Sequence, residues 1–195
     1  MGGTADRAGT LYQRTPTGWS AAQTFEQAAA SEDVDAHFFD ADNDGDADLY
    51  VVSGSSEFPT DDERLRDRFY RNQNGTFRYE PSALPDVRVA GSRAVAADAD
   101  GDGDLDLFVG GSIDLANYPH APRSQFLEND GTGNFTESTR KWASELQNIG
   151  MVRDAGWTDL NGDGRTDLVV VGEWMPVTVA YGTEDGFDLE RPTIC

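Results

Sequence analysis

The sequence predicts an all-β fold, namely a fragment of a β-propeller with about three and a half four-stranded blades. Three observations predict it. An acidic loop with the pattern D-x-[DN]-x-D-G-x-x-D occurs at residues 40–48, 98–106 and 159–167. The copies start 58 and 61 residues apart, and such a regular period is typical of repeat architectures. Apolar runs flank each loop, and a hairpin pattern follows it.

The composition indicates a folded chain and excludes some partners. The 195 residues are 37% hydrophobic and 10% aromatic, which argues against disorder. A formal net charge of -21 repels nucleic acid and anionic membranes, so we expect neither as a partner. No apolar run approaches the roughly 18 residues of a membrane span. Cys195 is the sole cysteine, which leaves no intrachain disulfide to stabilise the fold.

The first element is a hairpin at residues 9–24, with aromatic residues on both arms of a Pro/Gly turn. No acidic loop precedes it. We therefore expect it to be the outer half of a blade whose inner half precedes Met1. On this interpretation the chain is part of a longer protein, and the remainder of that protein is its first partner.

The pattern of residues 33–81 predicts the first complete blade. Their order is a strand, an acidic loop, a β-branched strand, a long polar loop, a strand, the turn Asn74–Gly75 and a last strand. Asn-Gly between two such runs is a strong hairpin signal. Four strands in one period are typical of a propeller blade.

Residues 92–139 and 152–191 repeat this order and predict the second and third blades. The third differs mainly in the short connection Gly172–Pro176 between its second and third strands. The acidic loop joins the first two strands in every blade. The whole chain, residues 1–195, is therefore expected to be one partial propeller.

The crowding of carboxylates in each loop predicts a bound cation. Oxygen ligands in a tight turn suit a hard cation, and calcium fits the spacing best. The expected side-chain ligands stand at loop positions one, three, five and nine. They are Asp40, Asp42, Asp44 and Asp48; Asp98, Asp100, Asp102 and Asp106; and Asp159, Asn161, Asp163 and Asp167.

Two alternatives fit the loops less well. An EF-hand or dockerin site needs an acidic ligand at position twelve and flanking helices, but position twelve is Val51, Val109 and Val170 and the flanks predict strands. Acidic turns without metal would hold their carboxylates against a repulsion of roughly 1 kcal/mol per pair even in water. Calcium is therefore the preferred interpretation.

The motifs Asp98–Gly111, Phe126–Gly131 and Gly172–Pro176 resemble those of a known family. The chain is similar to the FG-GAP/VCBS repeats of integrin-α-like β-propellers, particularly the cartilage-acidic-protein-like group that is often joined to an ASPIC/UnbV domain. The resemblance implies a calcium-loaded propeller in a secreted or cell-surface protein, with the bacterial periplasm or outer surface included.

The resemblance also implies a backbone carbonyl ligand at position seven, which falls on Asp46, Asp104 and Arg165. Three calcium sites result. The third has three carboxylates at the ligand positions where the others have four, so we expect it to be the weakest.

The sequence gives no sign of an enzyme. His37 and His120 are the two histidines, and neither G-x-S-x-G nor H-E-x-x-H occurs. We therefore expect a non-enzymatic interaction scaffold for a protein or glycan ligand. The alternative is an accessory propeller of a secreted polysaccharide-acting enzyme whose catalytic part lies outside this chain.

A ligand is expected on the face opposite the acidic loops. The loops between second and third strands supply aromatic and charged residues there, namely Glu57, Phe58, Pro59, Tyr118, Pro119, His120, Arg123, Glu173, Trp174 and Met175. Packing of Tyr118 and Trp174 between blades is an equally good interpretation. Open propeller edges could also pair two copies into a homo-oligomer.

Overall fold

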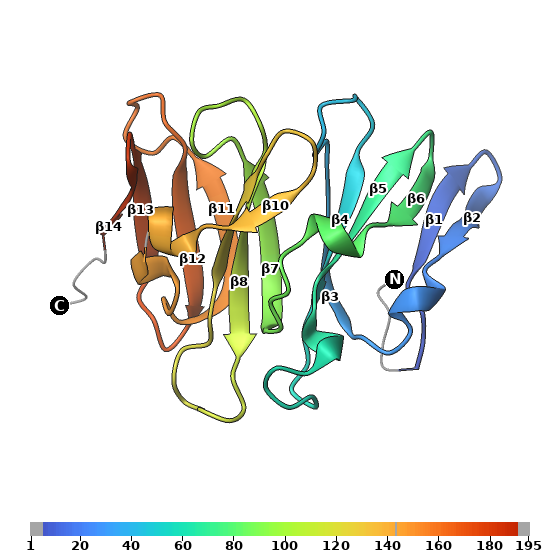
Figure 1. Ribbon diagram of the computed structural model, residues 1–195, viewed down its shortest axis with the longest axis horizontal. Helices are drawn as coiled ribbons and strands as arrows, with labels where there is room; N and C mark the ends of the chain where they lie inside the picture. Colours follow the sequence, from blue (N-terminus) through green and yellow to red (C-terminus); the bar gives the residue numbers. More distant parts are fainter. Residues whose placement is uncertain (1–5, 143, 191–195) are drawn as a thin grey trace.

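A computed structural model describes residues 6–142 and 144–190; residue 191, where the predicted third blade ends, and Cys195 lie outside the described residues. Four antiparallel sheets stand side by side in chain order (Figure 1). This arrangement confirms the prediction of an all-β propeller fragment. No helix among the described residues is long and apolar enough to span a membrane.

The first sheet is a two-stranded hairpin, which we call the half-blade. It consists of β1 (Thr10–Thr15) and β2 (Gly18–Thr24). A short 3-10 turn, Glu26–Ala28, leads from it toward the next sheet.

The other three sheets, called blades 1 to 3, each contain four strands paired in the order of the chain. Blade 1 comprises β3 (Asp33–Phe39), β4 (Asp48–Ser53), β5 (Arg68–Gln73) and β6 (Thr76–Tyr79); blade 2 comprises β7 (Ala90–Ala97), β8 (Asp106–Ile113), β9 (Gln125–Asn129) and β10 (Phe135–Glu137); blade 3 comprises β11 (Met151–Thr158), β12 (Asp167–Glu173), β13 (Thr178–Thr183) and β14 (Gly186–Glu190). We call the first two strands of a blade its inner hairpin and the last two its outer hairpin.

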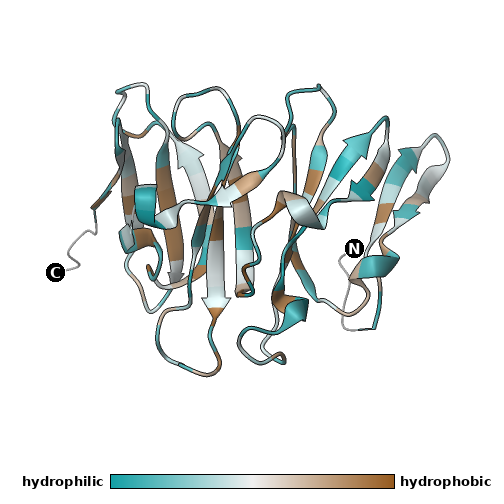
Figure 2. Ribbon diagram, in the orientation of Figure 1, coloured by the Kyte–Doolittle hydropathy of each residue, from teal (hydrophilic) through white to brown (hydrophobic). Residues whose placement is uncertain are grey.

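The core lies between the sheets because successive side chains of a strand point to opposite faces. On β4, Leu49 and Val51 pack toward the half-blade. Tyr50 and Val52 pack toward blade 2. Figure 2 shows hydrophobic residues along the strands and hydrophilic residues in most of the loops.

Ion pairs link the first strands of the three blades at one repeated position, which lies five residues before the start of each acidic loop. Arg93 on β7 forms ion pairs with Asp35 on β3 and Asp154 on β11, both at 3.2 Å. A β-bulge precedes each of these three residues and alters the local pairing in the same way. These two ion pairs join the three blades along the inner edge of the array.

A short helical segment between blades 2 and 3 was not predicted from the sequence. It contains α1 (Thr139–Trp142) and a 3-10 turn, Ser144–Leu146. The Trp142 ring packs against Phe126 and Phe187 at centroid distances of 5.6 and 6.3 Å. The segment therefore fills the space between the outer parts of these two blades.

A buried polar pair fastens the end of the long β4–β5 loop. The Asp67 carboxylate accepts hydrogen bonds from the Tyr50 hydroxyl at 2.7 Å and from the Ser53 amide at 2.8 Å. Burial raises the pKa of Asp67 to about 6, although these two hydrogen bonds act in the opposite direction.

This raised pKa makes a testable contribution to stability. Because the folded state holds the Asp67 proton more tightly than the unfolded state, the contribution is complete below about pH 4 and is lost as pH rises through about 6. Between pH 4 and 8 this lowers the free energy of unfolding of the wild-type protein by up to about 3 kcal/mol. We expect the Asp67→Asn variant to lack this pH-dependent decrease. Chemical denaturation of both proteins from pH 4 to 8 measures it, and parallel stability curves would contradict it.

Candidate metal site

The three acidic loops connect the two strands of each inner hairpin, at one common end of the blades (Figure 1). Their backbones share a conformation because positions four and six have positive φ angles in every copy. These positions are Asn43 and Gly45, Gly101 and Gly103, and Gly162 and Gly164. Glycine and asparagine tolerate this region, which explains their occurrence there.

The aspartate at position nine anchors each loop to the sheet. Asp48, Asp106 and Asp167 are buried, with 1%, 1% and 0% of their surfaces exposed. In every copy one carboxylate oxygen accepts a hydrogen bond from the backbone amide of position two. The other oxygen accepts one from a backbone amide of the third strand of the same blade. The donor pairs are Ala41 and Asn72, Ala99 and Asn129, and Leu160 and Gly182.

The electrostatics of loop 2 (residues 98–106) favour uptake of positive charge. Burial, together with the negative charges of Asp100 and Asp102, raises the pKa of Asp106 to about 7. The pKa of Asp100 is also raised, by burial and by Asp102. Carboxylates held in this way gain stability from a proton or a metal ion.

In loops 1 and 2, where positions one, three and five are all aspartates, the three carboxylates converge. The carboxylates of Asp40, Asp42 and Asp44 each offer an oxygen, and these oxygens lie within 4.8 Å of one another. The group of Asp98, Asp100 and Asp102 meets the same limit. Calcium takes oxygen ligands at about 2.3–2.6 Å, so one ion could contact all three oxygens of a group.

Asp42 shows the clearest sign of a missing partner. In loop 2 and loop 3 (residues 159–167) the side chain at position three accepts the amide of position five, at 3.1 and 2.9 Å. Asp42 instead forms an ion pair with Arg71 through Oδ2. Its Oδ1 is buried and has no hydrogen-bond partner. A buried oxygen without a partner is costly, and an ion shared with Asp40 and Asp44 would satisfy it.

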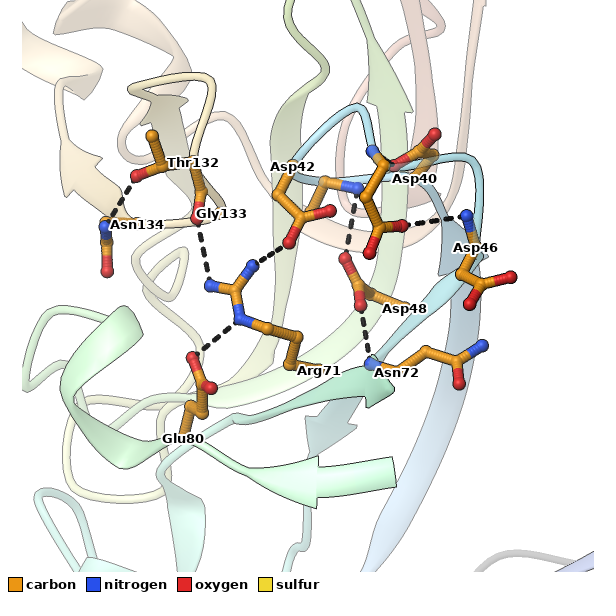
Figure 3. Close-up of polar contacts among 12 residues, drawn as sticks. Asp40, Asp42, Asp46, Asp48, Arg71, Asn72, Glu80, Thr132, Gly133 and Asn134 are labelled. Atoms are coloured by element: carbon orange, nitrogen blue, oxygen red, sulfur yellow. Dashed lines mark hydrogen bonds and ion pairs between the residues drawn. The ribbon is translucent and has the colours of Figure 1, made fainter. Parts of the chain in front are cut away.

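Arg71 also ties loop 1 (residues 40–48) to the neighbouring blade, as Figure 3 shows. Its guanidinium donates to Glu80 at 3.0 Å and to the carbonyl of Thr132 in the β9–β10 turn at 2.9 Å. By strand register, the residues that correspond to Arg71 of blade 1 are Glu128 in blade 2 and Tyr181 in blade 3. Loop 1 therefore has a cation beside it where loop 2 has an acid.

Two asparagines strengthen the contact between loops 1 and 2. The Asn43 amide donates to Asp104 Oδ1 at 2.7 Å. Asn129 Nδ2 donates to the carbonyls of Ala41, at 2.8 Å, and Leu105, at 3.2 Å. Sequence reasoning missed Arg71, Asn43 and Asn129 as functional neighbours because their contacts cross between blades, and the loop pattern carries no signal for them.

In loop 3 a side-chain amide and a guanidinium lie beside the carboxylate of Asp163, which supports the expectation that this site is the weakest. Asn161 Nδ2 donates to Asp163 Oδ2 at 3.1 Å, and Arg165 Nε lies 3.7 Å from the same oxygen. Both contacts engage an oxygen that a metal would need. The backbone carbonyls of Asp46, Asp104 and Arg165 stay predicted ligands. The backbone amides of the same three residues donate hydrogen bonds to the side chain at position five of their loop.

Asn161→Asp tests this ranking. The new carboxylate adds an anionic ligand at position three, so we expect calcium affinity at loop 3 to rise about tenfold or more. Calorimetric titration of metal-free protein measures it. Gln13→Glu, an exposed position on β1 with the same change of charge, is the matched control. Equal gains in the two variants would contradict a specific ligand position.

The comparisons with known proteins agree with this architecture. Residues 40–109, which include loops 1 and 2, match the family model of the FG-GAP-like repeat. The expected resemblance to this repeat is thereby confirmed, while the assignment to a particular subgroup stays a prediction. A search of curated proteins finds no match.

Proposed function

We propose that this chain, an FG-GAP repeat protein by its match at residues 40–109, is a calcium-binding propeller segment. It serves as a protein or glycan interaction scaffold within a larger secreted or cell-surface protein. The fold and the repeat support a propeller-like interaction domain. Calcium binding, location and ligand are the parts that we propose.

The buried, unpartnered Asp42 Oδ1 is the observation that carries the calcium proposal. Asp40 and Asp44 lie beside it, and their carboxylates are held in place by backbone amides of the loop. Backbone amides of the loop thus hold two of the three proposed ligand side chains in place. This preorganisation is what a selective oxygen-ligand site requires.

The proposed role of calcium is structural. In each loop the ion would join positions one, three and five, while the aspartate at position nine already connects the loop to the third strand. Binding to the folded state alone stabilises it by about 2.7 kcal/mol when free calcium is 100 times the dissociation constant.

Removal of calcium tests the proposal directly. We expect the Tm of the protein to fall by several degrees in excess EDTA, because the folded state loses its bound ligands. Differential scanning calorimetry measures the shift. Added calcium should restore the Tm, and magnesium at equal concentration should restore little of it. An unchanged Tm after verified metal removal would rule the proposal out.

The opposite end of the blades supports the proposed interaction surface. Trp174, in the β12–β13 connection, is 77% exposed, and Tyr118, in the β8–β9 loop, is 56% exposed. Trp174 also has a φ of 62°, an unfavourable angle for a bulky residue. Neither backbone preference nor packing explains a tryptophan there, which favours recognition over packing between blades.

The sequence-based list for this surface needs one correction. Phe58 is buried, with 5% of its surface exposed, and the Arg64 guanidinium covers its ring at 3.9 Å from the centroid. Phe58 therefore packs the long loop of blade 1. The proposed contact residues are the exposed aromatic pair, Tyr118 and Trp174.

Alanine substitution separates the two interpretations of this pair. We expect Tyr118→Ala and Trp174→Ala to leave the Tm within about 1 °C, because both rings are exposed, and to lower binding on glycan and protein arrays about tenfold. Trp142→Ala is the matched control and should lower the Tm, because that ring is 9% exposed. A large loss of Tm in Trp174→Ala would assign the ring to packing instead.

A further inference from the structure

A pocket of about 180 Å³ lies between the long connections of blades 1 and 2. It is bounded by the β4–β5 loop, the β6–β7 connection and the β8–β9 loop. The two long loops project from the end of the array opposite the acidic loops (Figure 1). The Thr60 hydroxyl donates to Asp114 Oδ1 at 2.8 Å and joins them. The pocket therefore spans two blades on the surface proposed above for recognition.

The floor of this pocket is apolar and packed. Phe58, Leu65 and Ala90 form one buried cluster, with 5%, 3% and 4% of their surfaces exposed, and Ile113 packs against it. All four residues line the pocket. Phe58 and Leu65 come from the long loop of blade 1, whereas Ala90 and Ile113 come from the inner hairpin of blade 2. Both blades thus contribute to a single floor.

Leu115 extends the apolar lining to the surface. It lines the pocket and is 44% exposed. Tyr118, in the same loop, is 56% exposed. A single leucine on a surface needs no explanation, but a leucine at the mouth of an apolar pocket offers area that a ligand can bury.

The size of the pocket indicates the class of ligand. Sites for small molecules usually enclose about 300–1,000 Å³, whereas a cavity of about 150 Å³ accommodates benzene. The observed volume of about 180 Å³ therefore fits one large apolar side chain. A sugar would place hydroxyl groups against Phe58 and Ile113, where they lose their hydrogen bonds to water. A polypeptide that inserts one apolar side chain fits the pocket better.

The charged residues at the pocket complement a carboxylate. In a chain with 36 acidic and 15 basic residues, the lining contains two arginines, Arg88 and Arg123, and one aspartate, Asp114. The Asp114 carboxylate already accepts hydrogen bonds from three protein donors. The guanidinium groups are therefore the charges that a ligand can use.

Arg123 is the arginine with the less complete set of partners. Arg88 donates two hydrogen bonds to Asp86, both at 3.0 Å. Arg123 contacts Glu137 Oε2 through Nη2 at 3.0 Å, its side chain is 37% exposed, and its Nε has no hydrogen-bond partner. A ligand carboxylate at the mouth of the pocket would gain a charged partner in Arg123.

We propose that this pocket anchors a protein ligand through a large apolar side chain that stands next to an acidic residue. The apolar side chain contacts the floor and Leu115, and the neighbouring carboxylate pairs with Arg123. The proposal rests on the interaction role proposed above and narrows its ligand from a protein or glycan to a protein. It does not depend on calcium binding by loops 1 to 3.

A second copy of this chain is not the expected occupant. Two copies that each carry a formal net charge of -21 repel each other, which disfavours self-association through a small pocket. The expected ligand is a different protein whose contact segment carries the acidic residue.

Capped dipeptides test the proposal. We would titrate the intact, isotope-labelled chain with the acetylated and amidated dipeptide Leu-Asp and follow the backbone amide signals by NMR. We expect saturable shifts centred on Ile113, Leu115 and Arg123. An Ala-Asp probe should bind about tenfold more weakly, because the buried apolar side chain is lost. A Leu-Asn probe should bind about fivefold more weakly, because the ion pair is lost.

Arg123→Gln tests the charged contact. The variant should bind the Leu-Asp and Leu-Asn probes equally and keep its preference for leucine over alanine. A merely structural role of Arg123 would weaken all three probes alike. Arg14→Gln, an exposed position on β1 with the same change of charge, is the matched control and should retain both preferences.

Leu115→Ser tests the apolar mouth. It should weaken binding of the Leu-Asp probe about fivefold, because apolar contact area is lost. Val34→Ser is the matched control, since Val34 is 47% exposed and lies on β3 outside the lining of the pocket. Probe binding should be unchanged in this control.

Four results would overturn the proposal: no shifts near the pocket, equal binding of Leu-Asp and Leu-Asn by the wild-type protein, equal binding of Leu-Asp and Ala-Asp, or sedimentation data in which Leu115→Ser dissociates a homodimer. A glycan that binds the chain when the dipeptides do not would reject this inference and leave the proposed scaffold intact. An unchanged Tm in EDTA would reject the calcium proposal and leave this inference standing.

Discussion

The buried aspartate at position nine of each loop is the interaction on which the rest of the structure depends. Asp48, Asp106 and Asp167 each connect the start of an acidic loop to the third strand of the same blade through two backbone amides. One side chain thus fixes the loop, the second strand and the outer hairpin relative to one another. Because the carboxylate is buried, its removal would leave backbone donors without partners as well as the loop without an anchor.

This anchoring divides the array into two ends with different properties. The loop end is acidic, and Arg71, Asn43 and Asn129 join blades 1 and 2 there. The other end presents the long connections, which begin after the buried second strands and need not follow the repeat. Exposed aromatic residues occur in those connections, where they can vary without disturbing the blades.

Much of the fold could be predicted from the sequence because each repeat encodes local features. The spacing of the loops gave the period, and apolar and β-branched runs with an Asn-Gly turn gave the strands of blade 1. The candidate ligands at positions one, three and five followed from the loop pattern alone, and in loops 1 and 2 the structure brings them together.

The features that could not be predicted depend on contacts between blades. A repeat pattern describes each blade by itself and carries no information on these contacts. The ion pairs of Arg93, the contact of Arg71 with the Thr132 carbonyl and the helical segment around Trp142 join residues from different blades or from their connections. The burial of Phe58 likewise depends on how the long loop folds back, so its aromatic character alone suggested a surface role.

A crystal structure of the protein grown in calcium would show whether the acidic loops hold the ion. We expect an ion in loops 1 and 2, with Asp42 Oδ1 at a calcium–oxygen distance of about 2.3–2.6 Å and the aspartates at position nine still buried. Loops without ions at saturating calcium, or Asp42 Oδ1 turned toward a protein donor, would contradict it.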